Sequence, residues 1–178
     1  EDSRKVIDEI LKSNRAVYGI NTGFGKFSET RIGKKDLADL QKRLVLSHAA
    51  GVGGPIPREV VQLMMLLKIK SLSHGHSGCS LKVVQFLVEM LNNNIIPVIP
   101  RKGSVGASGD LAPLAHMALV MMGMGSAFTV KSKTESGSYV WQRVEGKTAL
   151  ESAGLDPIIL EAKEGLALLN GTQTITAY

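Results

Sequence analysis

Small residues crowd the stretch GSVGASGDLAPLAH, which runs from Gly103 to His116. Glycines that lead into a helix expose backbone amides, and these can bind phosphate at the positive end of the helix dipole. The spacing G-x-x-G-x-x-G lacks the lysine and the hydroxyl residue of a P-loop, however. A tight turn before a helix that begins near Asp110, with Pro113 in its first turn, explains the same residues without a ligand.

A third interpretation of this stretch is covalent. In a tightly folded backbone the amide nitrogen of Gly109 can reach the carbonyl carbon of Ala107, because glycine has no Cβ to obstruct the approach. Loss of water from the Ser108 side chain would then leave a methylidene group on the ring, an electrophile that no ordinary side chain supplies. The N-terminus of the following helix would stabilise the negative charge that develops when a nucleophile adds.

The whole run GSVGASGDLAPLAHM resembles the signature of the aromatic amino-acid ammonia-lyase family. The cofactor of that family is 4-methylidene-imidazole-5-one (MIO), which forms autocatalytically from an Ala-Ser-Gly triplet. The resemblance therefore implies an MIO group made from Ala107, Ser108 and Gly109. Two further segments are similar to the family: YGINTGFG at 18–25 resembles its tyrosine loop, and EGLALLNGTQ at 164–173 resembles its asparagine segment.

The resemblance implies roles for three further residues. Tyr18 matches the catalytic base that removes the β-proton of the substrate, although a lone tyrosine before glycine is more often a packing anchor. Asn170 matches the residue that binds the amino-acid end of the substrate, and it can also be the C-cap of a helix before Gly171. Gln173 is a further substrate-binding candidate beside it.

His48 is the candidate for contact with the substrate ring. The segment LVLSHAAG at 44–51 resembles most closely the family members that act on histidine. A phenyl substrate would leave a buried polar group here unpaired, whereas an imidazole would not. The implied reaction is elimination of ammonia from L-histidine to give trans-urocanate, through attack on the MIO by either the amino group or the ring. A tyrosine or phenylalanine lyase, an aminomutase and a non-catalytic, self-associating chain remain alternatives.

The other histidines and the cysteine have structural interpretations. His116 lies two turns into the helix after Ser108 and is taken as structural. His74, His76 and Cys79 imitate a metal site within HGHSGC, but a structural zinc site usually has a fourth ligand and the sequence offers no second cluster. We therefore expect no metal.

These candidates must be positioned by a mainly α-helical fold. Apolar periodicity and cap residues predict several helices and a β-hairpin over 128–144 around Ser136-Gly137-Ser138. The helices are expected at 1–14, 34–50, 57–72, 81–91, 148–153 and 160–169. Ser80 is expected to cap the helix at 81–91, and the helix at 57–72 is expected to be buried. Residues 18–30 hold three glycines and no sustained period, which predicts an exposed or mobile loop.

Composition excludes several classes of protein. The net charge is +5, but the basic residues are scattered among acids and aromatic residues are only 4%, so we expect no nucleic-acid partner. The longest apolar run, 117–128, is shorter than the ~20 residues of a membrane span, so no membrane association is expected. One cysteine and no apparent leader predict a cytoplasmic location.

The resemblance also bears on extent and assembly. Residues 1–178 are expected to be a single domain, the N-terminal portion of the ammonia-lyase helical-bundle fold, since family members run well over twice as long. The family is homotetrameric, and each active site is built from three subunits. The remaining part of a family member would contain the arginine that grips the substrate carboxylate and most of the long helices, so we expect this chain to be inactive alone. Whether Ala107, Ser108 and Gly109 cyclise without that bundle is left open. The apolar helix at 60–72 is expected to pair with a second copy or to associate non-specifically.

Overall fold

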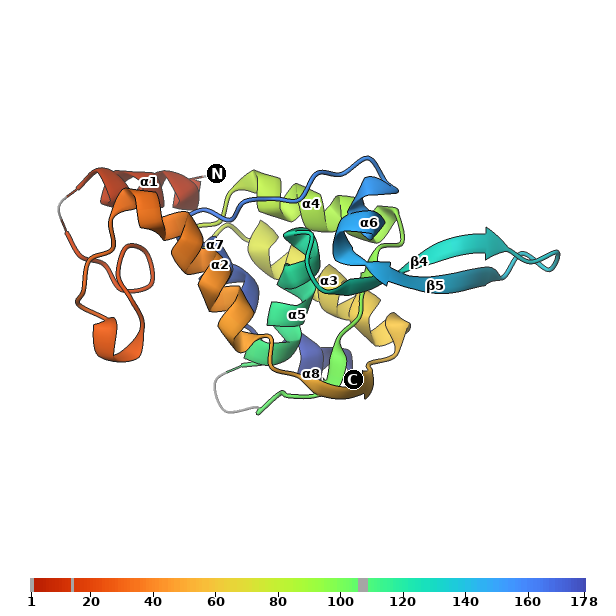
Figure 1. The fold of residues 1–178 in the computed structure, drawn as a ribbon. Helices are drawn as coiled ribbons and strands as arrows, with labels where there is room; N and C mark the ends of the chain where they lie inside the picture. The colour runs from red at the N-terminus through yellow and green to blue at the C-terminus, as the bar shows by residue number, and fades with distance from the viewer. Residues whose placement is uncertain (1, 14, 106–108) are drawn as a thin grey trace.

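The computed structural model describes residues 2–13, 15–105 and 109–178, and it is mainly helical (Figure 1). The helices are α1 (Asp2–Lys12), α2 (Leu37–His48), α3 (Arg58–Ser73), α4 (Leu81–Asn92), α5 (Leu111–Met121), α6 (Gly146–Glu151), α7 (Glu164–Leu169) and α8 (Gln173–Ala177), with 3-10 turns at Gly25–Phe27 and Lys34–Asp36. The predicted fold class, mainly α with one small hairpin, is confirmed.

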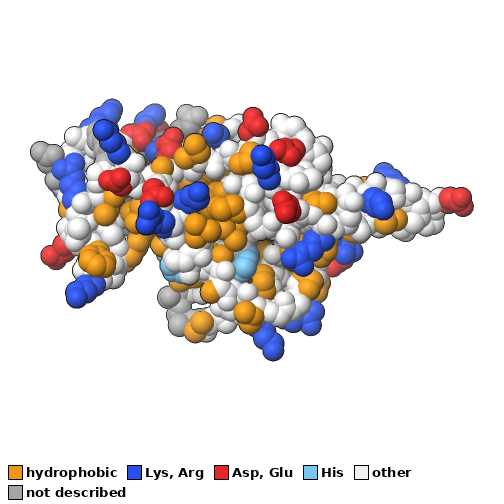
Figure 2. Space-filling view, in the orientation of Figure 1, with side chains coloured by type: hydrophobic (Ala, Val, Ile, Leu, Met, Phe, Trp, Pro, Cys, Tyr) orange, Lys and Arg blue, Asp and Glu red, His pale blue; other side chains and the backbone are white. Residues whose placement is uncertain are grey.

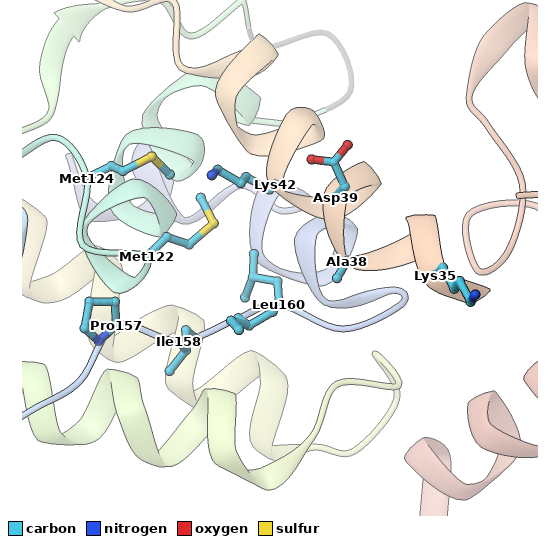
Figure 3. A pocket seen from close by; sticks show the side chains of 10 residues that line it. Lys35, Ala38, Asp39, Lys42, Met122, Met124, Pro157, Ile158 and Leu160 are labelled. Atoms are coloured by element: carbon cyan, nitrogen blue, oxygen red, sulfur yellow. The ribbon is translucent and has the colours of Figure 1, made fainter. Parts of the chain in front are cut away.

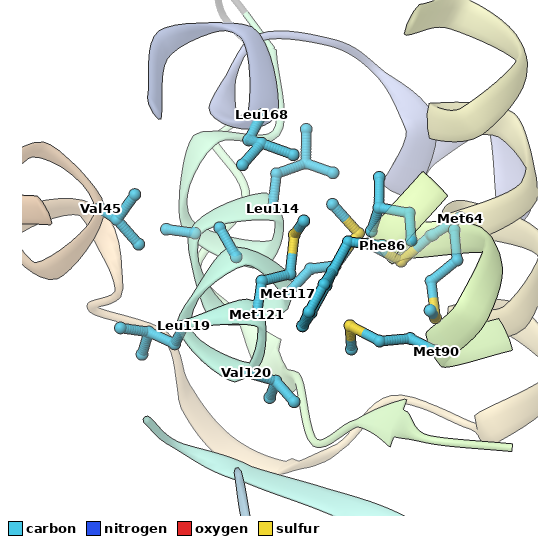
Figure 4. Close-up of a cluster of buried hydrophobic side chains, with 14 of the residues drawn as sticks. Val45, Met64, Phe86, Met90, Leu114, Met117, Leu119, Val120, Met121 and Leu168 are labelled. Carbon is cyan, nitrogen blue, oxygen red and sulfur yellow. The ribbon is translucent and has the colours of Figure 1, made fainter. Parts of the chain in front are cut away.

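Helix α5 is the centre of the core. It is apolar on every side, and eight of its residues are buried, which is expected of a helix enclosed by other elements. Figure 4 shows Leu114, Met117 and Met121 of α5 among side chains from α2, α3, α4 and α7. Because flexible methionine side chains fill irregular gaps, helices that meet at different angles can still pack closely here.

The helices around α5 bring distant segments together. α2, α5 and α7 contact one another, α3 packs against α4 and α8, and α6 packs against α5. Gly165 of α7 lies so close to α2 that a Cβ built on it would be 2.9 Å from Gln41 Oε1 and 3.1 Å from the Gln41 carbonyl oxygen. The Gly165 amide donates to that same Oε1 at 2.9 Å. This glycine therefore sets the distance between α2 and α7.

Two small antiparallel sheets complete the fold. β1 (Val52–Pro55) pairs with β3 (Pro100–Lys102), and β4 (Ser126–Lys133) lies between β2 (Ile96–Pro97) and β5 (Tyr139–Glu145). The predicted hairpin over 128–144 is thus confirmed, and it extends away from the helices (Figure 1). At its base, the Arg58 guanidinium of α3 lies 4.8 Å from the Trp141 ring centroid.

Two local expectations differ from the structure. Ser80 precedes α4 as predicted, but its side chain makes no capping hydrogen bond, and its backbone amide donates instead to Glu164 Oε1 at 3.0 Å. Helix α3 is not buried throughout, because Leu63 and Leu66 are 40% and 52% exposed. The chain folds so that only one side of α3 faces the core.

The loop over 18–30 is also not uniformly exposed, and the prediction is wrong for 19–23, which are buried. The side chain of Asn21 explains this, since its Oδ1 accepts from the Val17 amide at 2.7 Å and its amide donates to the Arg15 carbonyl at 2.9 Å. These local bonds satisfy polar backbone groups that water would otherwise reach. Tyr18 itself is 59% exposed.

Charged side chains are spread over the surface. Figure 2 shows lysine and arginine side chains interspersed with acidic ones, and a hydrophobic patch beside α2. Within the described residues, no helix is both long and apolar enough to cross a membrane.

Candidate functional site

One cavity collects side chains from four distant parts of the sequence. It has a volume of about 260 Å³. Its lining comprises Tyr18, Phe24, Leu44, His48, Leu111, Leu166, Leu169 and Asn170. The structure therefore brings together three of the predicted site residues, Tyr18, His48 and Asn170, which the sequence separates by up to 152 positions.

Tyr18 reaches the cavity from the loop after α1. Its ring packs edge to face on Phe24, with centroids 5.9 Å apart. Gly19 then lies against α7, where a Cβ would be 2.8 Å from a methyl carbon of Leu166. The side chain is thus supported on one side and open to solvent on the other, so its hydroxyl is accessible to a ligand.

His48 comes from the C-terminal end of α2. Its Nδ1 lies 2.8 Å from the Leu44 carbonyl oxygen and 3.1 Å from Ser47 Oγ. A carbonyl oxygen can only accept, so Nδ1 carries the proton in the neutral ring and Nε2 remains an acceptor. The neutral side chain can therefore accept a hydrogen bond from a polar ring.

Asn170 ends α7, and its C-cap position there matches the structural role that the sequence allows. The beginning of α7 is fixed by Glu164, which is 2% exposed. Glu164 Oε1 accepts from the Ser80 amide and Oε2 from the Glu161 amide at 2.7 Å, while Arg4 lies 3.7 Å from Oε1. Helix α7, which carries Asn170 at its C-terminal end, is therefore fixed at its N-terminal end.

A second cavity adjoins the first and leads to Gly109. It has a volume of about 350 Å³ and shares His48 and Leu111 with the first. Gly109 has φ +122°, and a Cβ on it would be 2.8 Å from the Gly171 carbonyl oxygen. Only glycine fits this backbone without strain. Ala107 and Ser108, the other two predicted MIO residues, lie outside the described part of the chain.

Asp110 links the Gly109 region to the asparagine segment. The side chain is fully buried, with Oδ1 accepting from Ser104 Oγ at 2.6 Å and Oδ2 from the Ile175 amide at 3.1 Å. Its own amide donates to the Gly171 carbonyl at 2.8 Å. Asp110 is at the expected N-cap of α5 but makes no side-chain capping bond. Its carboxylate joins three segments instead.

Lys68 is a residue that the sequence argument missed. It is 1% exposed, and its Nζ donates to the carbonyl oxygens of Ala167 at 3.2 Å and Asn170 at 2.8 Å. Burial lowers the pKa of Lys68 from 10.5 to about 8. The available signal was its spacing, since Lys68 is four residues from both Met64 and Leu72 on the buried stripe of α3.

Gln173 is placed differently from the other candidates. It begins α8 and does not line either of the two cavities. Its Oε1 is buried without a hydrogen-bond partner among the described residues. The structure therefore does not bring Gln173 to the cavity that holds Tyr18, His48 and Asn170.

The remaining histidines and the cysteine lie outside this cavity. His116 Nε2 accepts from the Gly51 amide at 3.0 Å, and burial lowers its pKa, so the neutral ring connects α5 to the segment after α2. Burial also raises the pKa of the Cys79 thiol. Among residues 2–13, 15–105 and 109–178, no cluster of three His, Cys, Asp or Glu side chains is arranged to hold a metal ion.

A larger cavity, about 500 Å³, lies elsewhere (Figure 3). Its wall is mostly apolar, with Met122, Met124 and Leu160 opposite Lys42 of α2. It contains none of the predicted site residues and no histidine, cysteine, serine or tyrosine to act on a substrate. We therefore assign the candidate site to the smaller, chemically equipped cavity.

The whole chain matches a known protein family. The family described as aromatic amino acid lyase matches residues 1–178. The histidine ammonia-lyases of Caldanaerobacter subterraneus subsp. tengcongensis and Vibrio cholerae are each 52% identical to it, over 98% and 99% of this chain but only 32% and 33% of their own lengths. The chain thus spans about a third of these relatives.

Solved structures of related enzymes have the same fold over this segment. Histidine ammonia-lyase from Trypanosoma cruzi matches with a TM-score of 0.83 and 40% identity, and Pantoea agglomerans phenylalanine aminomutase with 0.84 and 35%. Each comparison covers at least 98% of this chain and 32% of the other. From the family match over its full length, the chain belongs to the aromatic amino acid lyase family.

Proposed function

We propose that these residues form part of the active site of a histidine ammonia-lyase, which eliminates ammonia from L-histidine to give trans-urocanate. The observation that carries the proposal is the shared cavity of Tyr18, His48 and Asn170, which adjoins the cavity at Gly109. Residues that bind the two ends of an amino acid and a residue that takes its proton have to face one space, and this cavity meets that requirement.

The geometry supports a division of roles. The exposed hydroxyl of Tyr18 is available to take the β-proton of the substrate. The Asn170 amide, which carries both donors and an acceptor, can bind the amino-acid end. His48 Nε2 can accept a hydrogen bond from the imidazole N–H of histidine. The apolar wall of Leu44, Leu111 and Leu169 would exclude water around the ring.

The residues of this chain also fit the MIO cofactor of the family. A Cβ at Gly109 would collide with Gly171, so the site requires the one residue whose nitrogen can approach a neighbouring carbonyl unobstructed. The N-terminus of α5 begins directly after Asp110 and offers a positive dipole end. MIO formed from Ala107, Ser108 and Gly109 would supply an electrophilic methylidene carbon for the reaction.

The substrate is inferred from His48 and from the relatives together. Relatives at 52% identity carry the name histidine ammonia-lyase, whereas the aminomutases among the solved structures are 33–35% identical. An acceptor nitrogen at the ring position favours imidazole over phenyl, because a phenyl ring would leave it unpaired. An aminomutase shares the site but returns the amine to the β-carbon, so the product distinguishes the two.

The proposal includes assembly and location. We propose a cytoplasmic homo-oligomer, a tetramer as in the family, with sites shared between subunits. The exposed leucines of α3 support contact with a further protein surface, since Leu63 and Leu66 lie on one side of the helix.

A chimera tests the function. Residues 1–178 replace the matching third of the Vibrio cholerae histidine ammonia-lyase, to which they are 52% identical. The chimera should convert L-histidine to urocanate, followed by ultraviolet absorbance and product chromatography. Its intact mass should be two waters below the mass calculated from its sequence, whereas the Ser108→Ala variant, which cannot form the methylidene group, should have its calculated mass.

Tyr18→Phe in this chimera should lower kcat by about 10²–10⁴-fold, the usual contribution of a general base. Tyr139→Phe is the matched control, since Tyr139 lies on the hairpin, and it should keep the parent rate. A folded, tetrameric chimera that dehydrates Ser108 but yields a β-amino acid instead of urocanate would establish the aminomutase alternative. The lyase proposal fails if no product forms.

A further inference from the structure

A buried cation stands behind the candidate substrate-binding residue. Lys68 is in the middle of α3, on the stripe formed by Met64, Met65 and Leu72, which are 0%, 0% and 4% exposed. Lysine is among the residues that are rarely buried fully unless their charge is paired. At 1% exposure, Lys68 must therefore obtain its hydrogen bonds from the protein.

The partners of Lys68 are two carbonyl oxygens at the C-terminal end of α7, that of Ala167 in its last turn and that of its C-cap Asn170. Its ammonium donates to the Ala167 carbonyl at 3.2 Å and to the Asn170 carbonyl at 2.8 Å. Carbonyls in the last turn of a helix have no partner within the helix, and together they form the negative end of its dipole. A cation here satisfies both oxygens and is favoured by the dipole.

Other common ways to end a helix are not used at this position. Gly171, the residue after the C-cap Asn170, has φ +153°, far from the ~+57° of a left-handed cap, so the motif that would bond these carbonyls internally is not formed. Water has little access to the Ala167 carbonyl, because Ala167, Leu168 and Leu169 are buried. The Lys68 ammonium therefore supplies hydrogen bonds that a left-handed cap or water would otherwise give to these carbonyls.

The next peptide group is held from the opposite side. The carbonyl oxygen of Gly171 accepts from the Asp110 amide at 2.8 Å, at the start of α5. Two successive carbonyls, of Asn170 and Gly171, are thus bound by α3 and by α5. These two bonds fix the backbone that follows the Asn170 Cα, and on its other side the Asn170 amide donates to the Leu166 carbonyl at 3.0 Å. The Asn170 side chain lines the cavity.

From this arrangement we propose that Lys68 is a positioning residue, whose ammonium fixes the backbone of Asn170 so that its amide faces the substrate. Lys68 does not touch the cavity and takes no part in the chemistry. The inference rests on the proposed function, because it assigns Lys68 an effect on the amino-acid end of the substrate.

The test uses the same chimera with three substitutions. Lys68→Met removes the donors and keeps an unbranched side chain, Lys68→Arg keeps a cation with several donors, and Lys70→Met is the matched control at an exposed position of the same helix. Lys68→Met should lower kcat/KM for histidine by roughly 10–100-fold with a raised KM, since small misplacements of binding groups have effects of that size. Lys68→Arg should recover at least part of this loss, and Lys70→Met should match the parent.

A second readout does not depend on activity. Amide hydrogen exchange over 166–173, followed by mass spectrometry, should be about tenfold faster or more in Lys68→Met than in Lys70→Met, because the end of α7 has lost its donors. If the parent chimera makes no urocanate, the proposed function is refuted. Exchange that is still faster in Lys68→Met than in Lys70→Met would then support the anchoring of Asn170 by itself.

Other outcomes overturn the inference. A folded Lys68→Met chimera with parental kcat/KM and parental exchange would show that Asn170 needs no anchor. If Lys68→Met does not fold, Lys68→Gln, which keeps one pair of donors, takes its place. Failure of that variant to fold as well would make Lys68 a requirement of the whole fold and end its assignment as a positioning residue.

Discussion

Burial of Lys68 makes the stability of this chain depend on pH in a definite direction. Its folded pKa is about 8 against 10.5 for the exposed group, so between these values the unfolded chain holds a proton that the folded chain has released. Stability then rises with pH, by ~1.4 kcal/mol per unit for one group. The stabilisation that comes from release of this proton is complete above the unfolded pKa of 10.5, and it is lost as the pH falls to the folded pKa of about 8.

Urea unfolding of the wild type, Lys68→Met and Lys70→Met at pH values across this window measures the effect. The free energy of unfolding of the wild type minus that of Lys68→Met should increase by about 1 kcal/mol per pH unit. The difference between the wild type and Lys70→Met should stay constant, since Lys70 is exposed. A pH-independent difference for Lys68→Met would mean that Lys68 titrates as an exposed lysine.

Contact between α2 and α7 depends on the absence of a side chain at Gly165. Alanine normally favours a helix over glycine by up to ~1 kcal/mol. Here the added Cβ would lie 2.9 Å from Gln41 Oε1 and 3.1 Å from the Gln41 carbonyl oxygen, and such overpacking costs ~1–3 kcal/mol. The steric term is the larger, so Gly165→Ala should destabilise the chain and displace Asn170.

The matched control is Gly54→Ala, since a Cβ at Gly54 meets no atom within 4 Å. Its free energy of unfolding should stay within about 0.5 kcal/mol of the wild type, as for most surface changes. Denaturant unfolding of Gly165→Ala and Gly54→Ala measures the two free energies of unfolding. An increase in stability for Gly165→Ala would show that α7 can move away from α2 without loss.

The outer side of α3 should cause the isolated chain to associate. Leu63 and Leu66 are 40% and 52% exposed and lie one helical turn apart, so their apolar surfaces are adjacent. Sedimentation of the 178-residue chain should show self-association that a Leu63→Lys, Leu66→Lys double variant removes. Leu81→Lys, on α4 at 51% exposure, should leave association unchanged. A monomeric wild type would refute the expectation.

The sequence by itself determined the helical class, the hairpin and the segments that resemble the family. Helix positions follow from local causes, namely apolar periodicity, prolines near helix starts and the Asn92-Asn93-Asn94 end of α4, which act over one or two turns. The hairpin likewise depends on a turn whose residues are adjacent. The sequence argued for glycine at 109 from neighbouring backbone atoms, whereas the reason that the structure gives is the close approach of Gly171, a distant segment.

Tertiary structure alone decided which residues meet. The β1–β3 pairing joins short segments that are about 50 positions apart and have no periodicity to reveal them. The buried Lys68 ammonium bonds to carbonyls about 100 positions away. The common cavity of Tyr18, His48 and Asn170 depends on how α2, α5 and α7 pack, a property that no local pattern of residues records.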